Sequence, residues 1–159
     1  MPRRLRWPSG ILIGLVGAAT GVVVLLVAGA LTGRGASLIT DAGAHMLPHG
    51  LAAGTGLSPA VAYVIVHTAF YLAAGIAAVI LAGVADRFPP VMTALVLVMI
   101  IVEFGFLVFA TETVAEHRID GFAWGAFLVA HGAADIVFAL LLLRAHPSFL
   151  RELREGYEV

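Results

Sequence analysis

Residues 9–31 read SGILIGLVGAATGVVVLLVAGAL, a run without a charged side chain. A bilayer with a hydrocarbon core of about 30 Å is crossed by roughly 20 apolar residues in a helix. This run is therefore long enough to span a membrane, and it is too long for the apolar region of a signal peptide. Residues 28–30 (AGA) could form a small-residue cleavage site, but an uncleaved membrane span is the better interpretation.

The composition of the whole chain agrees with a membrane location. Of the 159 residues, 61% are hydrophobic and 12% are charged, and the net charge is −1. A soluble domain carries about 45–50% apolar and about 25% charged residues. Cysteine is absent, which excludes disulfides, thiolate metal sites and a cysteine nucleophile. The near-neutral charge gives no support for nucleic-acid binding.

Three further segments resemble the first span in length and hydrophobicity. The four predicted spans cover residues 9–31, 59–84, 90–110 and 122–143. Ser58 and Pro59 form a good helix start, with serine as the N-cap and proline in the first helical position. We therefore expect an all-α fold, an integral membrane four-helix bundle. Residues 1–159 should form a single membrane domain, with an outer loop at 32–57 and a tail at 147–159.

The arginines give the expected orientation, because cytoplasmic loops carry an excess of basic residues. One side of the predicted bundle holds all the arginines except Arg34 and Arg118, which lie on the other side. Both termini are therefore predicted to be cytoplasmic, with the chain in the inner membrane of a bacterium. The lipid bilayer is then its first partner.

The outer loop contains a weaker polar pattern. Asp41, His45 and His49 are each four residues apart, which would place them on one face of a helix. Two histidines at this spacing and a carboxylate can bind a metal ion, although solvated loops often carry such residues without one. We expect a short surface or re-entrant helix here, and a helix that folds back would cap the bundle from outside.

Small residues form a stripe along the first span at Gly14, Gly17 and Gly21. Residues 17–21 match the G-x-x-x-G pattern, which lets helix backbones approach closely. The stripe could dock a second copy of the chain or a larger membrane complex. Packing against the other helices of the same chain is the interpretation that we favour.

Four ionisable residues lie within the predicted spans: His67, Glu103, His131 and Asp135. Such side chains are costly at membrane depth and are functional candidates by default. From the helical rise, His67, Glu103 and His131 lie about 12–13 Å below the outer surface, and Asp135 lies one turn deeper than His131. Groups at one depth that all avoid lipid must meet in the core of the bundle.

Three interpretations of this cluster remain open. Two histidines and Glu103, with Asp135 as a fourth ligand, are a sufficient donor set for Fe, Zn or Mn. Alternatively, His67 and His131 could ligate a haem b from opposite sides. In the third interpretation, the carboxylates pair with neighbouring donors, and the cluster is structural or handles protons. Tyr63 and Tyr71, one turn either side of His67, could add hydroxyls to the same site.

Three short motifs stand out in the second half of the chain: YVIVHTAF at 63–70, VEFGF at 102–106 and RAHP at 144–147. They resemble a family of small, uncharacterised four-span bacterial membrane proteins over roughly residues 59–153. The resemblance implies no activity, but it implies that His67 and Glu103 belong together. Members more often have an amide near position 131, which counts against a strict haem pair of His67 and His131.

No motif for nucleophilic catalysis or phosphate binding is present in the sequence. We therefore expect a non-enzymatic or accessory membrane protein with a buried His/carboxylate cluster that binds a divalent metal. The alternatives are a haem b electron-transfer protein and a structural subunit of a larger membrane complex.

Overall fold

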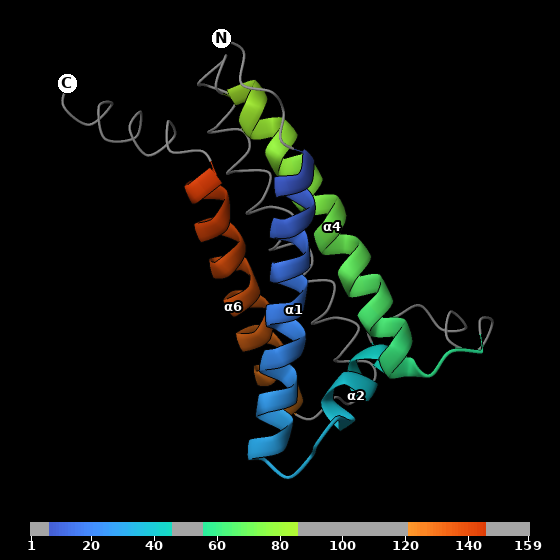
Figure 1. The fold of residues 1–159 in the computed structure, drawn as a ribbon. Coiled ribbons are helices and arrows are strands. Elements are labelled where there is room, and N and C mark those ends of the chain that lie inside the picture. Colours follow the sequence, from blue (N-terminus) through green and yellow to red (C-terminus); the bar gives the residue numbers. More distant parts are fainter. Residues whose placement is uncertain (1–6, 46–55, 86–120, 146–159) are drawn as a thin grey trace, which may run out of the picture.

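The computed structural model describes residues 7–45, 56–85 and 121–145 (Figure 1). These residues form four helices: α1 (Trp7–Leu31), α2 (Ser37–His45), α4 (Pro59–Ala85) and α6 (Gly121–Ala145). The described part of the chain contains no strand, and the prediction of an all-α fold is confirmed. The predicted span at 90–110 and the tail at 147–159 lie outside the described residues.

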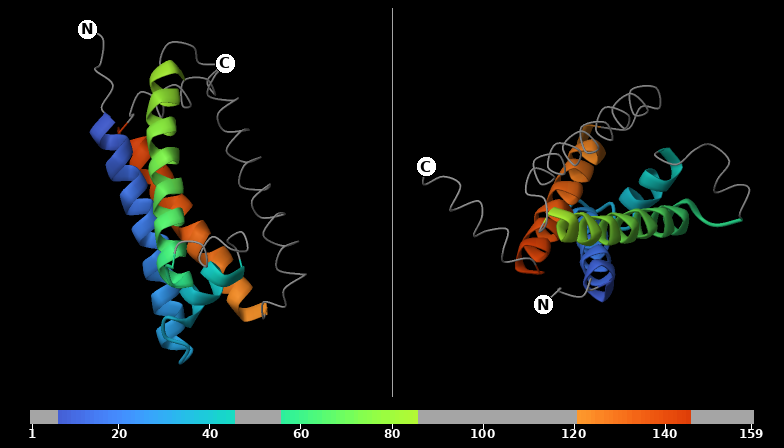
Figure 2. Two further views of the ribbon diagram at one scale, coloured as in Figure 1. Left: turned by 90° about the vertical axis from the view of Figure 1, so that its right-hand side faces the viewer. Right: turned by 90° about the horizontal axis from the view of Figure 1, so that it is seen from above.

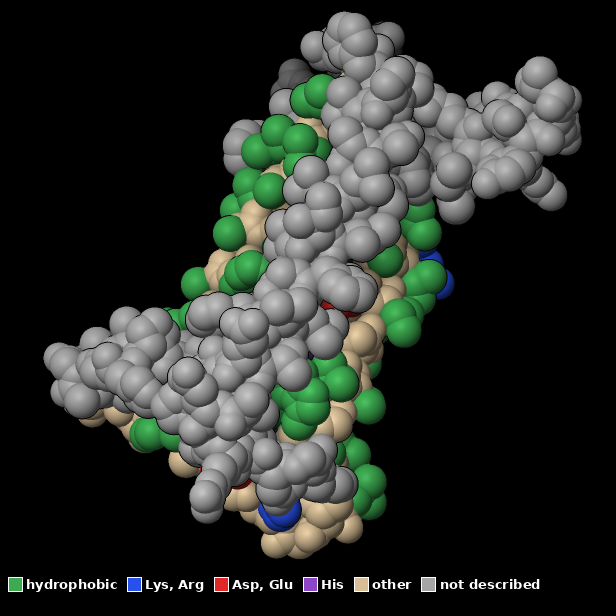
Figure 3. All heavy atoms as spheres, turned by 180° about the vertical axis from the view of Figure 1, so that it is seen from behind, with side chains coloured by type: hydrophobic (Ala, Val, Ile, Leu, Met, Phe, Trp, Pro, Cys, Tyr) green, Lys and Arg blue, Asp and Glu red, His purple; other side chains and the backbone are tan. Residues whose placement is uncertain are grey.

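Three of the helices are long and apolar enough to cross a membrane. Their apolar stretches are Pro8–Leu31, Pro59–Val84 and Trp124–Ala145, close to three of the four spans predicted from the sequence. Large apolar side chains such as Leu12, Val129 and Ile136 are more than half exposed on these helices. In the space-filling view, hydrophobic side chains dominate the visible parts of the described helices (Figure 3). These features are those of a multi-pass membrane protein, in which such side chains contact lipid.

The directions of the three described long helices agree with the predicted order of crossings. α1 runs opposite to α4 and α6, so the start of α1 lies at the same end of the bundle as the ends of α4 and α6 (Figures 1 and 2). The predicted order of crossings requires this arrangement. That this end faces the cytoplasm remains a prediction from the arginines.

α1 is the central helix of the described bundle. It packs along both α4 and α6, whereas α4 and α6 make little contact with each other. Glycines allow α1 and α4 to cross closely, since a Cβ atom at Gly10 would lie 2.8 Å from the carbonyl oxygen of Gly75. Gly14, Gly17 and Gly21 are also buried against α4. The small-residue stripe thus serves packing within the chain, and its face of α1 is not open to a second copy.

α2 fills the space between the long helices at the other end of the bundle, where α1 and α4 diverge (Figures 1 and 2). The chain turns back after α1 through Gly33 and Gly35, whose φ values of 72° and 58° suit glycine. Leu38, Ile39 and Ala42 of α2 are at most 5% exposed. α2 therefore buries its apolar face inside the bundle instead of lying on its surface.

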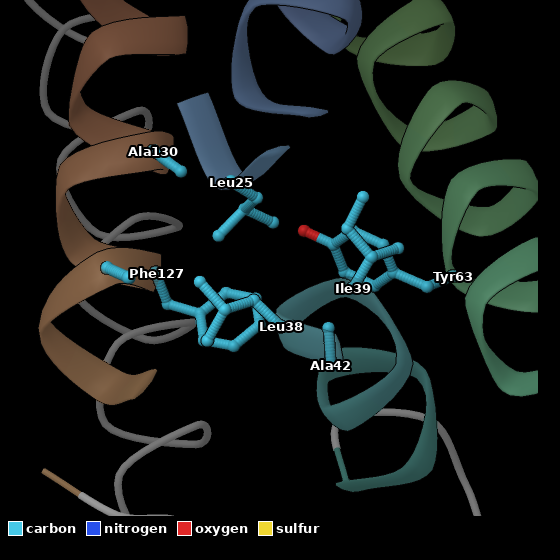
Figure 4. Close-up of a cluster of buried hydrophobic side chains, with 8 residues drawn as sticks. Leu25, Leu38, Ile39, Ala42, Tyr63, Phe127 and Ala130 are labelled. Atoms are coloured by element: carbon cyan, nitrogen blue, oxygen red, sulfur yellow. The ribbon is translucent and has the colours of Figure 1, made fainter. Parts of the chain in front are cut away.

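The buried apolar side chains form two clusters, one above the other along the bundle. The first lies at the α2 end (Figure 4) and consists of Leu25, Leu38, Ile39, Ala42, Tyr63, Ala126, Phe127 and Ala130. The second lies toward the crossing of α1 and α4 and consists of Ile13, Ala18, Tyr71, Ala78, Val79, Ala134 and Phe138. Tyr63 belongs to the first cluster and Tyr71 to the second, so His67 lies where the two clusters meet.

Candidate functional site

One face of α4 carries the candidate site. Tyr63, His67 and Tyr71 are four residues apart, so they occupy successive turns of the same face. All three are buried, at 5%, 6% and 3% exposure. Within the residues that the structure describes, His67 is the one buried histidine. The face therefore points into the bundle, as the sequence predicted for groups that avoid lipid.

The two tyrosine rings hold the His67 imidazole between them. The ring centroids of Tyr63 and His67 are 5.2 Å apart with an interplanar angle of 22°, a stacked arrangement. On the other side, the Tyr71 ring is 4.8 Å away and tilted by 54°. Aromatic contacts of this kind favour a definite ring orientation. The His67 imidazole is thus positioned by its own helix.

His131 on α6 meets His67 across the bundle. Their ring centroids are 5.3 Å apart and the rings stand edge to face at 78°. The Tyr71 ring also lies 6.5 Å from the His131 ring, nearly parallel to it. The structure thus brings together the two histidines that the sequence placed at one depth.

Asp135 lies one turn further along α6 and has a different partner. Its Oδ1 atom accepts a hydrogen bond of 3.0 Å from the hydroxyl of Tyr71. This bond links α4 to α6 and satisfies a polar group that hydrocarbon would not solvate. The sequence suggested Tyr71 as a hydroxyl donor to the site, and the structure shows which group receives it.

α1 contributes backbone to the site. A Cβ atom at Gly21 would lie 2.9 Å from Nε2 and 3.2 Å from Cε1 of His67, and the imidazole also forms a hydrogen bond with the backbone of Ala18. The sequence pattern predicted Gly21 as part of a packing stripe and did not predict its contact with His67. A signal was present, because Gly21 is ten residues from the end of the first predicted span, about 15 Å deep and close to the depth of His67.

Two buried polar atoms of the site, Oη of Tyr63 and Nε2 of His67, have no hydrogen-bond partner within the described part of the chain. Buried polar atoms in proteins nearly always have a partner, either in the protein or in a bound water or ion. Leaving one unsatisfied costs about 1–3 kcal/mol. A bound water or ion, or a residue outside the described part of the chain, would stabilise each of the two atoms.

The structure describes only some of the remaining predicted site residues. Asp41 lies on α2 and is half-buried, and His45 is the last residue of α2. His49 and Glu103 lie outside the described residues. Among the described residues, no three His, Asp or Glu side chains are close enough together to hold a metal ion. The described site is therefore a two-histidine centre beside a Tyr71–Asp135 pair.

The spacing of the two imidazoles bears on what they can bind. Two histidines that share one tetrahedral ion, with metal–nitrogen bonds of about 2.0–2.1 Å, have ring centroids roughly 5 Å apart. The observed 5.3 Å agrees with such a pair and is also an ordinary distance for an edge-to-face contact between two rings. Two histidines on opposite faces of a haem must have the macrocycle between them. The edge-to-face contact of His67 and His131 leaves no space for it in this arrangement.

Comparison of the chain with protein-family models, with curated proteins and with solved structures gives no match. The resemblance drawn from the short motifs therefore remains an expectation, and the function has to be argued from the residues themselves. What the residues show is a small multi-pass membrane protein with a histidine centre buried among its spanning helices.

Proposed function

We propose that this protein is an accessory membrane protein, without catalytic activity of its own, that binds a divalent transition metal ion through His67 and His131. One observation carries the proposal: two imidazoles from different helices meet inside the bundle at 5.3 Å, and Nε2 of His67 is buried without a hydrogen-bond partner among the described residues. Neutral imidazole is a good ligand for zinc and iron. The core of a helical bundle is a usual place for such ions.

The other ligands follow from the sequence. Two histidines leave a tetrahedral ion incomplete, and Glu103 is the third ligand predicted at the same depth. Asp135 was predicted as the fourth ligand, but it does not lie close enough to share an ion with His67 and His131, and its hydrogen bond with Tyr71 gives it a supporting role instead. Groups that surround the ligands of a metal commonly fix their orientation.

Metal analysis of the purified, detergent-solubilised protein tests the proposal. We expect stoichiometric zinc or iron in the wild type, its loss in His67→Ala and His131→Ala, and reduced content in Glu103→Ala. Ile136→Ala is a suitable control, because this side chain lies on α6 but is 63% exposed. A wild-type protein that binds no metal under metal-replete conditions, or equal content in all variants, would contradict the proposal. An absorption spectrum tests the haem alternative. A Soret band that is present in the wild type and lost in His67→Ala would show that the site binds haem and not a metal ion.

A second candidate function is a purely structural one, favoured by the Tyr71–Asp135 hydrogen bond. Here the polar side chains would hold α4 and α6 together for docking into a larger complex. Interhelical hydrogen bonds in membranes stabilise by about 0.6–2 kcal/mol each, which is sufficient for this role. Under this alternative the wild type co-purifies with a partner, contains no metal, and tolerates Glu103→Gln.

A further inference from the structure

Gly21 of α1 faces the edge of the His67 imidazole that carries the unpartnered nitrogen. His67 is 6% exposed, so this nitrogen is deeply buried. A Cβ atom at Gly21 would lie 2.9 Å from Nε2 and 3.7 Å from the Cβ atom of Ala134 on α6. Three helices, α1, α4 and α6, therefore meet at the position that a side chain of residue 21 would fill.

We infer that Gly21 is a specificity-determining residue of the metal centre, because a side chain at this position would lie against Nε2 of His67, where an ion would bind. The inference rests on the proposed function. It adds the position at which the ion binds and the size of ligand that the site accepts. An ion bound to imidazole lies about 2.0–2.1 Å from the nitrogen. A methyl group 2.9 Å from that nitrogen would overlap an ion on this side of the ring.

The chemistry of the position selects the class of ligand. Imidazole suits borderline ions such as Zn²⁺, Fe²⁺ and Co²⁺, whereas Mg²⁺ and Ca²⁺ prefer shells of oxygen ligands and water. The backbone of α1 lies against the ring edge, a closeness that disfavours a bulky planar cofactor on this side of the ring.

Other glycines of the same helices provide matched controls. A Cβ atom at Gly17 would also meet an aromatic ring at 2.9 Å, but that ring is Tyr71. A Cβ atom at Gly132 on α6 would have no neighbour within 4 Å. Gly17→Ala therefore tests the effect of crowding the Tyr71 ring, which contacts His67, and Gly132→Ala tests the substitution alone.

The experiment is a Co²⁺ titration of the full-length protein in detergent, followed by visible absorption and repeated with Zn²⁺ in competition. We expect Gly21→Ala to weaken Co²⁺ binding by more than about tenfold, the scale on which changes around metal ligands act. Gly132→Ala should stay within a few-fold of the wild type, and Gly17→Ala should lose less affinity than Gly21→Ala. Equal binding by Gly21→Ala and the wild type, or an equal loss in Gly17→Ala, would overturn the role of Gly21. A wild type that binds no Co²⁺ or Zn²⁺ would instead overturn the proposed function.

If Gly21→Ala does not fold, a measurement on the wild-type protein can test the inference instead. In protein labelled with ¹³C-glycine, bound Co²⁺ should shift the Gly21 resonance more than those of Gly17 and Gly132, because paramagnetic shifts fall steeply with distance. A Gly21 resonance that Co²⁺ leaves unshifted, while the absorption shows binding, would place the ion elsewhere and overturn the inference.

Discussion

His67 depends on residues of three helices for its position. Tyr63 and Tyr71 hold its ring from α4, His131 meets it from α6, and Gly21 gives it room from α1. Its depth in the membrane followed from counting residues along a helix. The neighbours of His67 could not be predicted in this way, because they depend on how each helix is rotated about its own axis. A shift of one residue along a helix corresponds to a rotation of about 100°. For this reason the pairing of Tyr71 with Asp135 and the contact of Gly21 came only from the structure.

At the residue scale, the Tyr71–Asp135 hydrogen bond gives a direct prediction. Tyr71→Phe removes the hydroxyl that donates a hydrogen bond to the carboxyl group of Asp135. We therefore expect the free energy of unfolding to fall by about 1–2 kcal/mol. A double-mutant cycle of Tyr71→Phe and Asp135→Ala, measured by unfolding in mixed micelles, should give a coupling energy of about 1 kcal/mol. Additive effects of the two substitutions would show that the bond contributes nothing to stability.

At the scale of the element, the long helices were the easiest part to predict. A spanning segment must satisfy its backbone internally, so a long apolar run in lipid has to be a helix. Pro59, predicted as the first residue of a span, begins α4 in the structure. The placement of α2 was harder, since its nine residues are only moderately apolar and the sequence allowed both a surface and a re-entrant helix. Burial of Leu38 and Ala42 depends on the divergence of α1 and α4, which no local pattern encodes.

The burial of α2 can be tested with single cysteines, because the chain has none of its own. Ala42 is 0% exposed and Thr40 is exposed on the same helix. We expect Thr40→Cys to react readily with a membrane-impermeant maleimide, and Ala42→Cys to react more than about tenfold more slowly, since reaction requires local opening. Similar rates at both positions would place α2 on the surface of the bundle.

At the scale of the whole molecule, the orientation in the membrane remains to be measured. The distribution of arginines predicts that the end holding Thr32 faces outward and the end holding Ala145 faces the cytoplasm. Both residues are exposed in the structure. In intact bacterial cells, Thr32→Cys should therefore react with an impermeant reagent, and Ala145→Cys should react only after the membrane is opened. The reverse pattern would invert the topology and place α2 on the cytoplasmic side.

The two ends of the described bundle close off His67 in unequal ways. On one side lie Gly10, Gly14 and Gly75, where two spanning helices touch backbone to backbone. On the other side lies α2, nine residues long and joined to α1 through two glycines. Displacing α2 would move a nine-residue helix, with the close backbone contact of its Gly43 to Pro59 of α4, whereas parting the glycine crossing would separate whole transmembrane helices. Within the described part of the chain, access to the histidines past these elements would thus be easier from the end that holds α2 than from the end that holds the glycine crossing.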